Sequence, residues 1–280
     1  MIDNGTGDSQ STVNWTVVKI VIAVLALVGY FGWRIFSTAA HYPVVLINGL
    51  EDPYDLTIND QTYSLDGYAM QRVELPLGDH EILTAGPAGL PAAIPLKLDF
   101  PIHQLAFKNE VVVVNPDGLA LLIEEETIYQ SDDMPEYEEE LEVLVHTAAN
   151  QYVLKDIDYP FEEFPEEITL VNSQTGDFKR RLYQYIPDDG NDAIRVASQY
   201  TDAETAADYG RNYLAIYPED PTGMIFRIRR IFQPDDYLAL LETRLEDQPI
   251  LVDWHRAYQD AMERADRIAE LRQKYDGLLE

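Results

Sequence analysis

An apolar run near the start of the sequence, WTVVKIVIAVLALVGYFGWRIF, limits this chain more than any other feature. No charged residue lies between Lys19 and Arg34, and a helix needs roughly 20 apolar residues to cross the hydrocarbon core of a bilayer. Trp15 and Trp33 stand near the two ends of the run, where aromatic side chains favour the membrane interface. The run therefore predicts a transmembrane anchor over residues 15–37, preceded by a short tail, residues 1–14.

A cleaved signal peptide is the main alternative for this run. Signal peptides begin with basic residues and have an apolar core of about 7–15 residues, whereas the leader MIDNGTGDSQST contains no Lys or Arg. The small residues from Ser37 to Ala40 resemble a cleavage site, so processing stays open. We expect an uncleaved anchor. Its orientation is weakly specified, because one basic residue, Lys19 or Arg34, stands at each end.

The net charge of −30 lies entirely outside the predicted anchor. In residues 1–43 the acidic residues Asp3 and Asp8 are balanced by Lys19 and Arg34. A surface this negative repels nucleic acid and anionic lipid, and it favours cations and basic partners. Because the chain contains no cysteine, it cannot form disulfides, thiol nucleophiles or Cys-ligated metal sites.

Residues 43–131 have the pattern of a small antiparallel β-sandwich. Short apolar or alternating segments are separated by turns rich in Gly, Pro, Asn and Asp, such as Asn48-Gly49 and the NPDG segment at 115–118. The predicted strands lie near residues 44–47, 54–58, 63–65, 72–75, 80–84, 111–114 and 119–129.

Residues 132–187 combine an acidic stretch with patterns of mixed type. The acidic residues at 136–142 predict an exposed linker, and the apolar residues at 143–145 and 168–171 look like strands. We expect an acidic linker with a mixed extension that either enlarges the sandwich or bridges to the next unit.

From residue 188 onward the apolar period becomes helical and predicts an all-α, repeat-like unit over residues 188–280. Its helices are expected near 192–200, 203–217, 222–232, 234–245 and 249–279. The segment from Asp188 to Asp192 lacks the ligand spacing of a calcium loop and predicts a turn and helix cap. The fold class is therefore expected to be α+β, with a transmembrane helix, a small antiparallel β-sandwich and a helical unit in that order.

Motifs of the common enzyme classes are absent from the sequence. No two of the five histidines lie within a helical turn of each other, which excludes a helical zinc motif. There is no phosphate-binding loop and no Gly-x-Ser-x-Gly nucleophile motif. Carboxylates are so abundant that no pair stands out as a catalytic pair. We expect no catalytic residues, no metal site and no cofactor.

Two basic clusters stand out against the acidic background, Lys179-Arg180-Arg181 and the group Arg227, Arg229 and Arg230. They either offset neighbouring acids within the fold or form a docking patch for an acidic partner. We favour the first interpretation.

Three parts of the sequence resemble known proteins. The segment AADYGRNYLAIYPEDP at 206–221 resembles the second helix of a tetratricopeptide repeat and the step after it. Residues 44–84, with Asn48-Gly49 and then Pro76-x-Gly78-x-His80, look like small bacterial surface sandwich domains. The whole layout is similar to uncharacterised single-pass bacterial envelope proteins. This resemblance implies binding or scaffolding rather than catalysis. We expect a bacterial inner-membrane protein with its larger part in the periplasm, because a short uncleaved N-terminal anchor commonly delivers a domain across the membrane.

The leading hypothesis is a non-enzymatic, membrane-anchored binding or scaffold protein that presents a helical interaction surface to other envelope proteins or peptides. The residues expected to form this surface are Tyr209, Tyr213, Tyr217, Arg227, Arg229, Arg230, Trp254, His255 and Tyr258. One alternative is a membrane-anchored hydrolase with a carboxylate pair in or beside the β-sandwich. Another is an oligomer built through a coiled coil from Trp254 to Leu278. The oligomeric state and the partner are left open.

Overall fold

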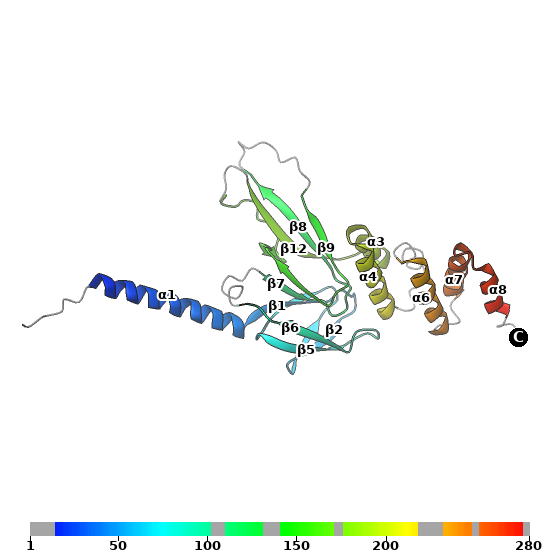
Figure 1. The fold of residues 1–280 in the computed structure, drawn as a ribbon, viewed down its shortest axis with the longest axis horizontal. Helices are drawn as coiled ribbons and strands as arrows, with labels where there is room; N and C mark the ends of the chain where they lie inside the picture. The colour runs from blue at the N-terminus through cyan, green and yellow to red at the C-terminus, as the bar shows by residue number, and fades with distance from the viewer. Residues whose placement is uncertain are drawn as a thin grey trace, which may run out of the picture.

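The computed structural model describes residues 15–101, 110–130, 141–170, 176–217, 232–247 and 252–276. Figure 1 shows a long helix at the N-terminal end, a group of β-sheets in the middle, and a row of short helices at the C-terminal end. The expected α+β composition and the order of its parts are confirmed.

Helix α1 (Trp15–Ala40) is apolar and projects away from the sheets (Figure 1). Its segment Lys19–Ala40 is long and apolar enough to cross a membrane, and 0% of the apolar window is buried within the protein. This observation excludes a buried core helix. The C-terminal end of α1 does contact the sheets, because Thr38 is buried and the Leu77 N–H donates to the Ala39 carbonyl at 2.8 Å.

The described strands form three four-stranded sheets. The central sheet has the order β10 (Gln151–Lys155), β7 (Glu110–Val114), β1 (Tyr42–Ile47), β4 (Met70–Leu75). The second has the order β3 (Gln61–Leu65), β2 (Tyr54–Ile58), β5 (Gly78–Ala85), β6 (Ala93–Leu98). The third has the order β11 (Tyr159–Pro160), β12 (Asp177–Tyr185), β8 (Leu121–Tyr129), β9 (Val143–His146).

The central sheet is a middle layer with a core on each face. Val44 and Leu46 of β1 pack in the core shared with the second sheet, whereas Val45 and Ile47 pack in the core shared with the third. Strands buried on both faces are apolar at successive positions rather than alternating, which explains the runs VVLI in β1 and VVVV in β7.

This arrangement differs from the expected antiparallel sandwich. There are three layers, and β1 pairs in parallel with β7, as β11 does with β12. The expected strands of residues 43–131 are present. Strands β9, β10 and β12 come from residues 132–187 and pair with β8 or β7, so this segment enlarges the β unit. The strand expected at 168–171 is wrong over residues 168–170, which have no regular secondary structure, and residue 171 lies outside the described residues.

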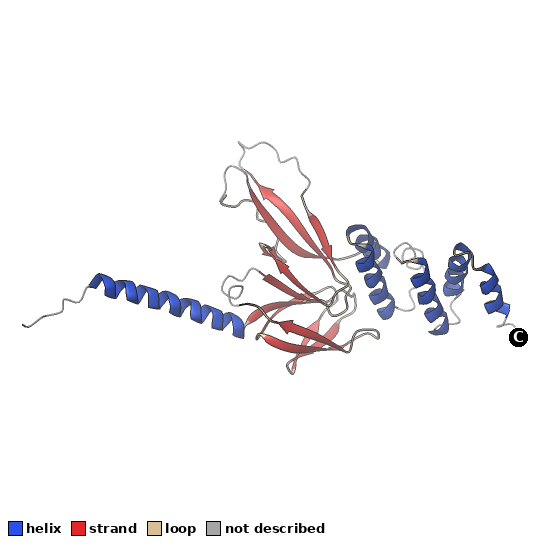
Figure 2. Ribbon diagram, in the orientation of Figure 1, coloured by secondary structure: helices blue, strands red, loops and turns tan. Residues whose placement is uncertain are grey.

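The C-terminal part consists of short helices (Figure 2). The described ones are α3 (Gly190–Tyr200), α4 (Ala203–Ile216), α6 (Pro234–Asp247), α7 (Val252–Arg264) and α8 (Ile268–Asp276). Helices α3 and α4 pack together, as do α6 and α7. Asp189 caps α3 through its side chain, which confirms the predicted cap. The helix expected near 222–232 lies mostly outside the described residues.

The single helix expected over residues 249–279 is wrong, because the chain turns between α7 and α8. Asp266 has a left-handed φ of 57°. The Arg267 N–H donates to the Met262 carbonyl and the Asp266 N–H to the Glu263 carbonyl, which is the hydrogen-bond pattern of a Schellman helix end. A continuous coiled coil from Trp254 to Leu278 is therefore incompatible with this structure.

Candidate binding pocket

A pocket of about 340 Å³ lies where the sheets meet helices α3 and α4. We call it the junction pocket. Tyrosines and carboxylates make up most of its polar lining: Tyr68, Tyr209, Tyr213, Tyr217, Glu51, Asp52, Asp188 and Asp189. Three of these tyrosines, Tyr209, Tyr213 and Tyr217, are among the residues that the sequence predicted to form an interaction surface.

The buried side chain of Asn48 shapes the sheet side of the junction pocket. Its Nδ2 donates to the carbonyls of Asp52 and Asp66, each at 2.9 Å, and its Oδ1 accepts from the Leu50 N–H at 2.7 Å. These bonds hold the loop after β1 against the turn between β3 and β4. As a result, the loop presents Glu51 and Asp52 to the pocket.

Tyr68 reaches the pocket from an unusual backbone position. Its φ of 54° lies in the left-handed region, which non-glycine residues adopt only when their surroundings hold them there. The Tyr68 N–H donates to the Leu50 carbonyl at 2.8 Å. At the neighbouring Gly67, a Cβ would lie 1.8 Å from the Glu51 carbonyl oxygen, so this close approach requires glycine.

Asp117 lies beside the floor of the pocket and is 3% exposed. Its carboxylate accepts the Tyr54 hydroxyl at 2.7 Å, the Leu119 N–H at 2.7 Å and the Gly49 N–H at 2.9 Å. Burial raises the pKa of Asp117, and these hydrogen bonds oppose the shift. The role of Asp117 is to join the β1 loop to the loop after β7, and sequence reasoning assigned it only to a turn.

Helix α4 forms the opposite wall. Its N-terminus is capped by Asp202, whose Oδ1 accepts from the N–H groups of Glu204 and Thr205. Asn212 fixes α4 to the β unit, because its Nδ2 donates to the Ala148 carbonyl at 3.0 Å. The rings of Tyr213 and Tyr217 lie 4.8 Å apart at an angle of 44°. The helix therefore contributes a pair of tilted tyrosine rings to the pocket.

Tyr209 is 2% exposed and lines the junction pocket. Its hydroxyl makes no hydrogen bond with any residue in the described part of the chain, and the oxygen is not fully enclosed by protein. Burial raises the pKa of Tyr209 well above its ordinary value, and the nearby Asp117 adds to the shift. The phenol therefore stays neutral and offers both a donor and an acceptor to an occupant of the pocket.

The pocket carries negative charge that no described lysine or arginine fully neutralises. Among the described residues, no lysine or arginine pairs with Glu51, Asp52 or Asp188. The Asp189 carboxylate is instead used within the fold, because its Oδ1 accepts the Asp192 N–H at 2.7 Å as the N-cap of α3. Burial raises the pKa of Tyr217 to about 12, and the charges of Asp52 and Glu51 contribute to this shift.

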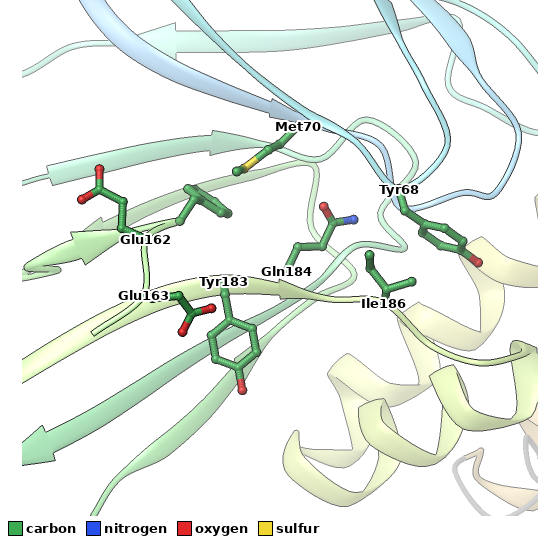
Figure 3. Close-up of a pocket in the computed structure, with 8 residues that line it drawn as sticks. Tyr68, Met70, Glu162, Glu163, Tyr183, Gln184 and Ile186 are labelled. Carbon is green, nitrogen blue, oxygen red and sulfur yellow. The ribbon is translucent and has the colours of Figure 1, made fainter. Parts of the chain in front are cut away.

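A second pocket, of about 290 Å³, lies next to the first, and its two glutamates are paired with arginines. Figure 3 shows Glu162 and Glu163 on one side of it, while the ring of Tyr68 is turned toward the helices. Glu163 pairs with Arg181, and Glu162 lies 3.6 Å from Arg72. These ion pairs make the second pocket a weaker candidate for a charged ligand.

The basic cluster at 179–181 is engaged within the fold. Lys179 pairs with Asp158 at 3.0 Å, Arg180 with Glu126 at 3.3 Å, and Arg181 with Glu125 at 2.7 Å. The interpretation that these residues offset neighbouring acids is confirmed.

The remaining predicted surface residues lie elsewhere. Trp254 and Tyr258 are each 1% exposed and pack in the core of the helical unit. The Tyr258 hydroxyl donates to Glu242 at 2.9 Å, and the His255 Nδ1 is 2.7 Å from the Tyr275 hydroxyl. The structure does not bring these residues to the junction pocket. Arg227, Arg229 and Arg230 lie outside the described residues.

Within the described ranges, no group of three or more His, Asp or Glu side chains could hold a metal ion. No protein-family model, curated protein sequence or solved structure matches this chain.

Alkaline pH should weaken the fold through its buried tyrosines. Burial raises the pKa of Tyr42 and Tyr217 to about 12, so the unfolded chain releases these phenolic protons first, near its ordinary pKa of about 10. The stability that the protonated phenols contribute is complete below about pH 10 and is lost as the pH rises toward 12, at up to about 1.4 kcal/mol per pH unit for each group.

Urea unfolding at a series of alkaline pH values would measure this loss. Tyr217→Phe should reduce the slope of the free energy of unfolding against pH, because phenylalanine has no proton to release. The exposed Tyr200 provides the matched control, since Tyr200→Phe should leave the slope unchanged. Equal slopes in wild type and Tyr217→Phe would contradict the prediction.

Proposed function

We propose that this chain is a non-enzymatic, single-pass membrane protein that binds a partner polypeptide in the junction pocket. In this proposal α1 anchors the protein in the bacterial inner membrane, and the sheets and helices stand in the periplasm. The main support is the junction pocket itself, with four tyrosines and carboxylates that no described lysine or arginine neutralises.

The connection between α1 and the sheets supports a retained anchor. Only His41 separates α1 from β1. Ile35 and Ala39 pack against the core, and Thr38 is buried. Cleavage after Ala40 would remove these contacts and the acceptor of the Leu77 N–H. A discarded signal peptide has no need of such contacts.

The position of the pocket suits a binding role. In Figure 1, α1 and helices α3 and α4 lie on opposite sides of the sheets, so the junction pocket is on the side away from the anchor. With a direct connection from α1 to β1, the pocket would be held at a set distance from the bilayer, where a polypeptide in the same compartment can reach it.

The hydrolase alternative has less support. It needs two carboxylates in a cleft, one of them desolvated. Asp117 is desolvated, but three donors of the protein occupy its oxygens. Glu51 and Asp52 lie in the pocket, but both are exposed. A binding role needs no desolvated catalytic carboxylate, so it is compatible with this arrangement.

Retention of the anchor can be tested directly. We expect the full chain to remain in the membrane pellet after an alkaline carbonate wash, with an N-terminal sequence that still includes Trp15. The buried Thr38 and the exposed apolar surface of α1 are the physical reasons. A soluble product that begins after Ala40 would contradict the prediction, and a known peripheral membrane protein in the same wash provides the control.

Binding in the junction pocket can be tested by photo-crosslinking in intact membranes. A photoreactive phenylalanine at Tyr217 should form a specific adduct, whereas the same group at the exposed Gln61 on β3 should not. The adduct should decrease at least about fivefold in the Glu51→Gln/Asp52→Asn variant, because the loss of two charge interactions of about 0.5–1 kcal/mol each lowers affinity by this order. Equal adduct formation at both positions would contradict the proposed function.

A further inference from the structure

We propose that the junction pocket recognises one lysine or arginine side chain of the partner polypeptide. This inference rests on the proposed function and specifies its ligand. Three features support it: tyrosine rings that line the pocket, carboxylates that pair with no described lysine or arginine, and a tyrosine hydroxyl that hydrogen-bonds to no described residue.

The aromatic faces favour an organic cation. Tyr213 and Tyr217 lie one helical turn apart with their rings 4.8 Å from each other, and Tyr68 approaches from the sheet side. A guanidinium or ammonium group over a tyrosine ring is attracted by the negative face of the ring, and the attraction increases when water is excluded. The alkyl part of the same side chain can pack against the rings.

The carboxylates favour a positive charge of this kind over a metal ion. Glu51 and Asp52 come from the β1 loop and Asp188 from the segment before α3, and no described lysine or arginine pairs with any of them. The described acidic and histidine side chains do not form a metal-binding group of three or more. A flexible cationic side chain can meet carboxylates at this wider spacing through charge and one or two hydrogen bonds.

The hydroxyl of Tyr209 supplies the independent observation. Tyr209 is 2% exposed and lines the pocket, and its hydroxyl has no hydrogen-bond partner in the described part of the chain. The hydroxyl oxygen is not fully enclosed by protein, so an occupant of the pocket can reach it. An ammonium or guanidinium N–H in the junction pocket would give the Tyr209 oxygen the donor that it lacks.

Arg181 shows how this fold engages a cationic side chain. Its guanidinium lies 4.6 Å from the centre of the Tyr183 ring and 4.9 Å from that of Phe164, and it pairs with Glu125 and Glu163. The junction pocket is lined by the same kinds of group, tyrosine rings and carboxylates, and no arginine or lysine is among its described lining residues.

The test uses the full chain in lipid nanodiscs, with isotope-labelled tyrosine rings observed by NMR. The probes are the peptides acetyl-Gly-Arg-Gly-amide and acetyl-Gly-citrulline-Gly-amide, which have nearly the same shape and differ in charge. We expect the arginine peptide to shift the ring signals of the pocket tyrosines in the millimolar range and to bind at least about tenfold more tightly than the citrulline peptide. Equal affinities, or no binding of either peptide, would overturn the inference.

Two variants locate the effect. Tyr209→Phe should weaken binding of the arginine peptide about threefold or more and leave the urea midpoint unchanged, because the hydroxyl has no hydrogen-bond partner among the described residues. Glu51→Gln/Asp52→Asn should also weaken binding, whereas Asp79→Asn/Glu81→Gln, which removes the same charge from β5, should not. Equal effects of the two double variants would overturn the inference.

The outcomes separate this inference from the proposed function. If the crosslink from Tyr217 forms but the arginine and citrulline peptides bind equally, the pocket binds a partner by other chemistry and the cation inference is wrong. If the crosslink fails while the arginine peptide binds selectively, the pocket recognises cations but the proposed partner function is wrong.

Discussion

Asp117→Ala should lower the free energy of unfolding by about 3–5 kcal/mol. The substitution leaves the Gly49 N–H, the Leu119 N–H and the Tyr54 hydroxyl without their acceptor, and each buried donor without a partner costs about 1–3 kcal/mol. The costs do not add in full, because the Tyr54 hydroxyl also lies 3.4 Å from the Ile47 carbonyl. Urea unfolding of the full chain, followed by circular dichroism, measures the change.

Two control variants define the cause. Tyr54→Phe removes one of the three donors to the Asp117 carboxylate and leaves the other two hydrogen bonds in place. It should therefore lower the free energy of unfolding by only about 1 kcal/mol. Asp55→Ala removes an exposed carboxylate on the next residue and should stay within about 0.5 kcal/mol of wild type. If Asp117→Ala costs no more than Asp55→Ala, the Asp117 carboxylate does not hold the two loops together.

The strands were predictable where local sequence determines them. Turns such as Asn48-Gly49 and alternating segments such as β2 mark strand positions without any knowledge of the fold. The layer order was not predictable in this way, because the parallel pairing of Val44 with Val112 joins residues far apart in the chain. The uninterrupted apolar runs of β1 and β7 are nevertheless typical of strands in a sheet that is buried on both faces.

Four described strands, β6, β10, β11 and β12, were not predicted, and for β6 and β12 the sequence gives the reason. Strand β6 contains Pro95, which lowers a strand prediction, but β6 is an edge strand, where a missing N–H is tolerated. Strand β12 contains Lys179, Arg180 and Arg181. These consecutive charged residues obscured the alternation of apolar and polar residues that predicts a strand. Those charges are compatible with a sheet because carboxylates of β8 lie opposite them, such as Glu126 beside Arg180.

The candidate site was predictable only in part. Tyr209, Tyr213 and Tyr217 were predicted to belong to an interaction surface on a helix, and the structure brings them to one pocket. The carboxylates that complete the pocket come from two distant loops, and only the fold brings these loops together. Asp117 had no local signal either, since it is one of 50 acidic residues in the sequence. Burial, which distinguishes Asp117 from the others, is a property of the tertiary structure.

Trp254→Ala should lower the free energy of unfolding of the helical unit by about 3–5 kcal/mol. The sequence assigned Trp254 to an interaction surface, but its side chain is 1% exposed and packs with the core residues of α6 and α7. Removing a buried tryptophan loses its transfer free energy and leaves a large cavity. Urea unfolding monitored by the helical signal of the full chain measures the effect.

A comparison with Trp254→Phe separates packing from hydrogen bonding. The buried indole Nε1 has no hydrogen-bond partner in the described structure, so phenylalanine loses volume but no hydrogen bond and should cost only about 1–2 kcal/mol. The exposed neighbour provides the control, because Arg256→Ala should change stability by no more than about 0.5 kcal/mol. A Trp254→Ala variant as stable as Arg256→Ala, but deficient in partner binding, would return Trp254 to the interaction surface and show that α7 turns its indole outward in the membrane-bound protein.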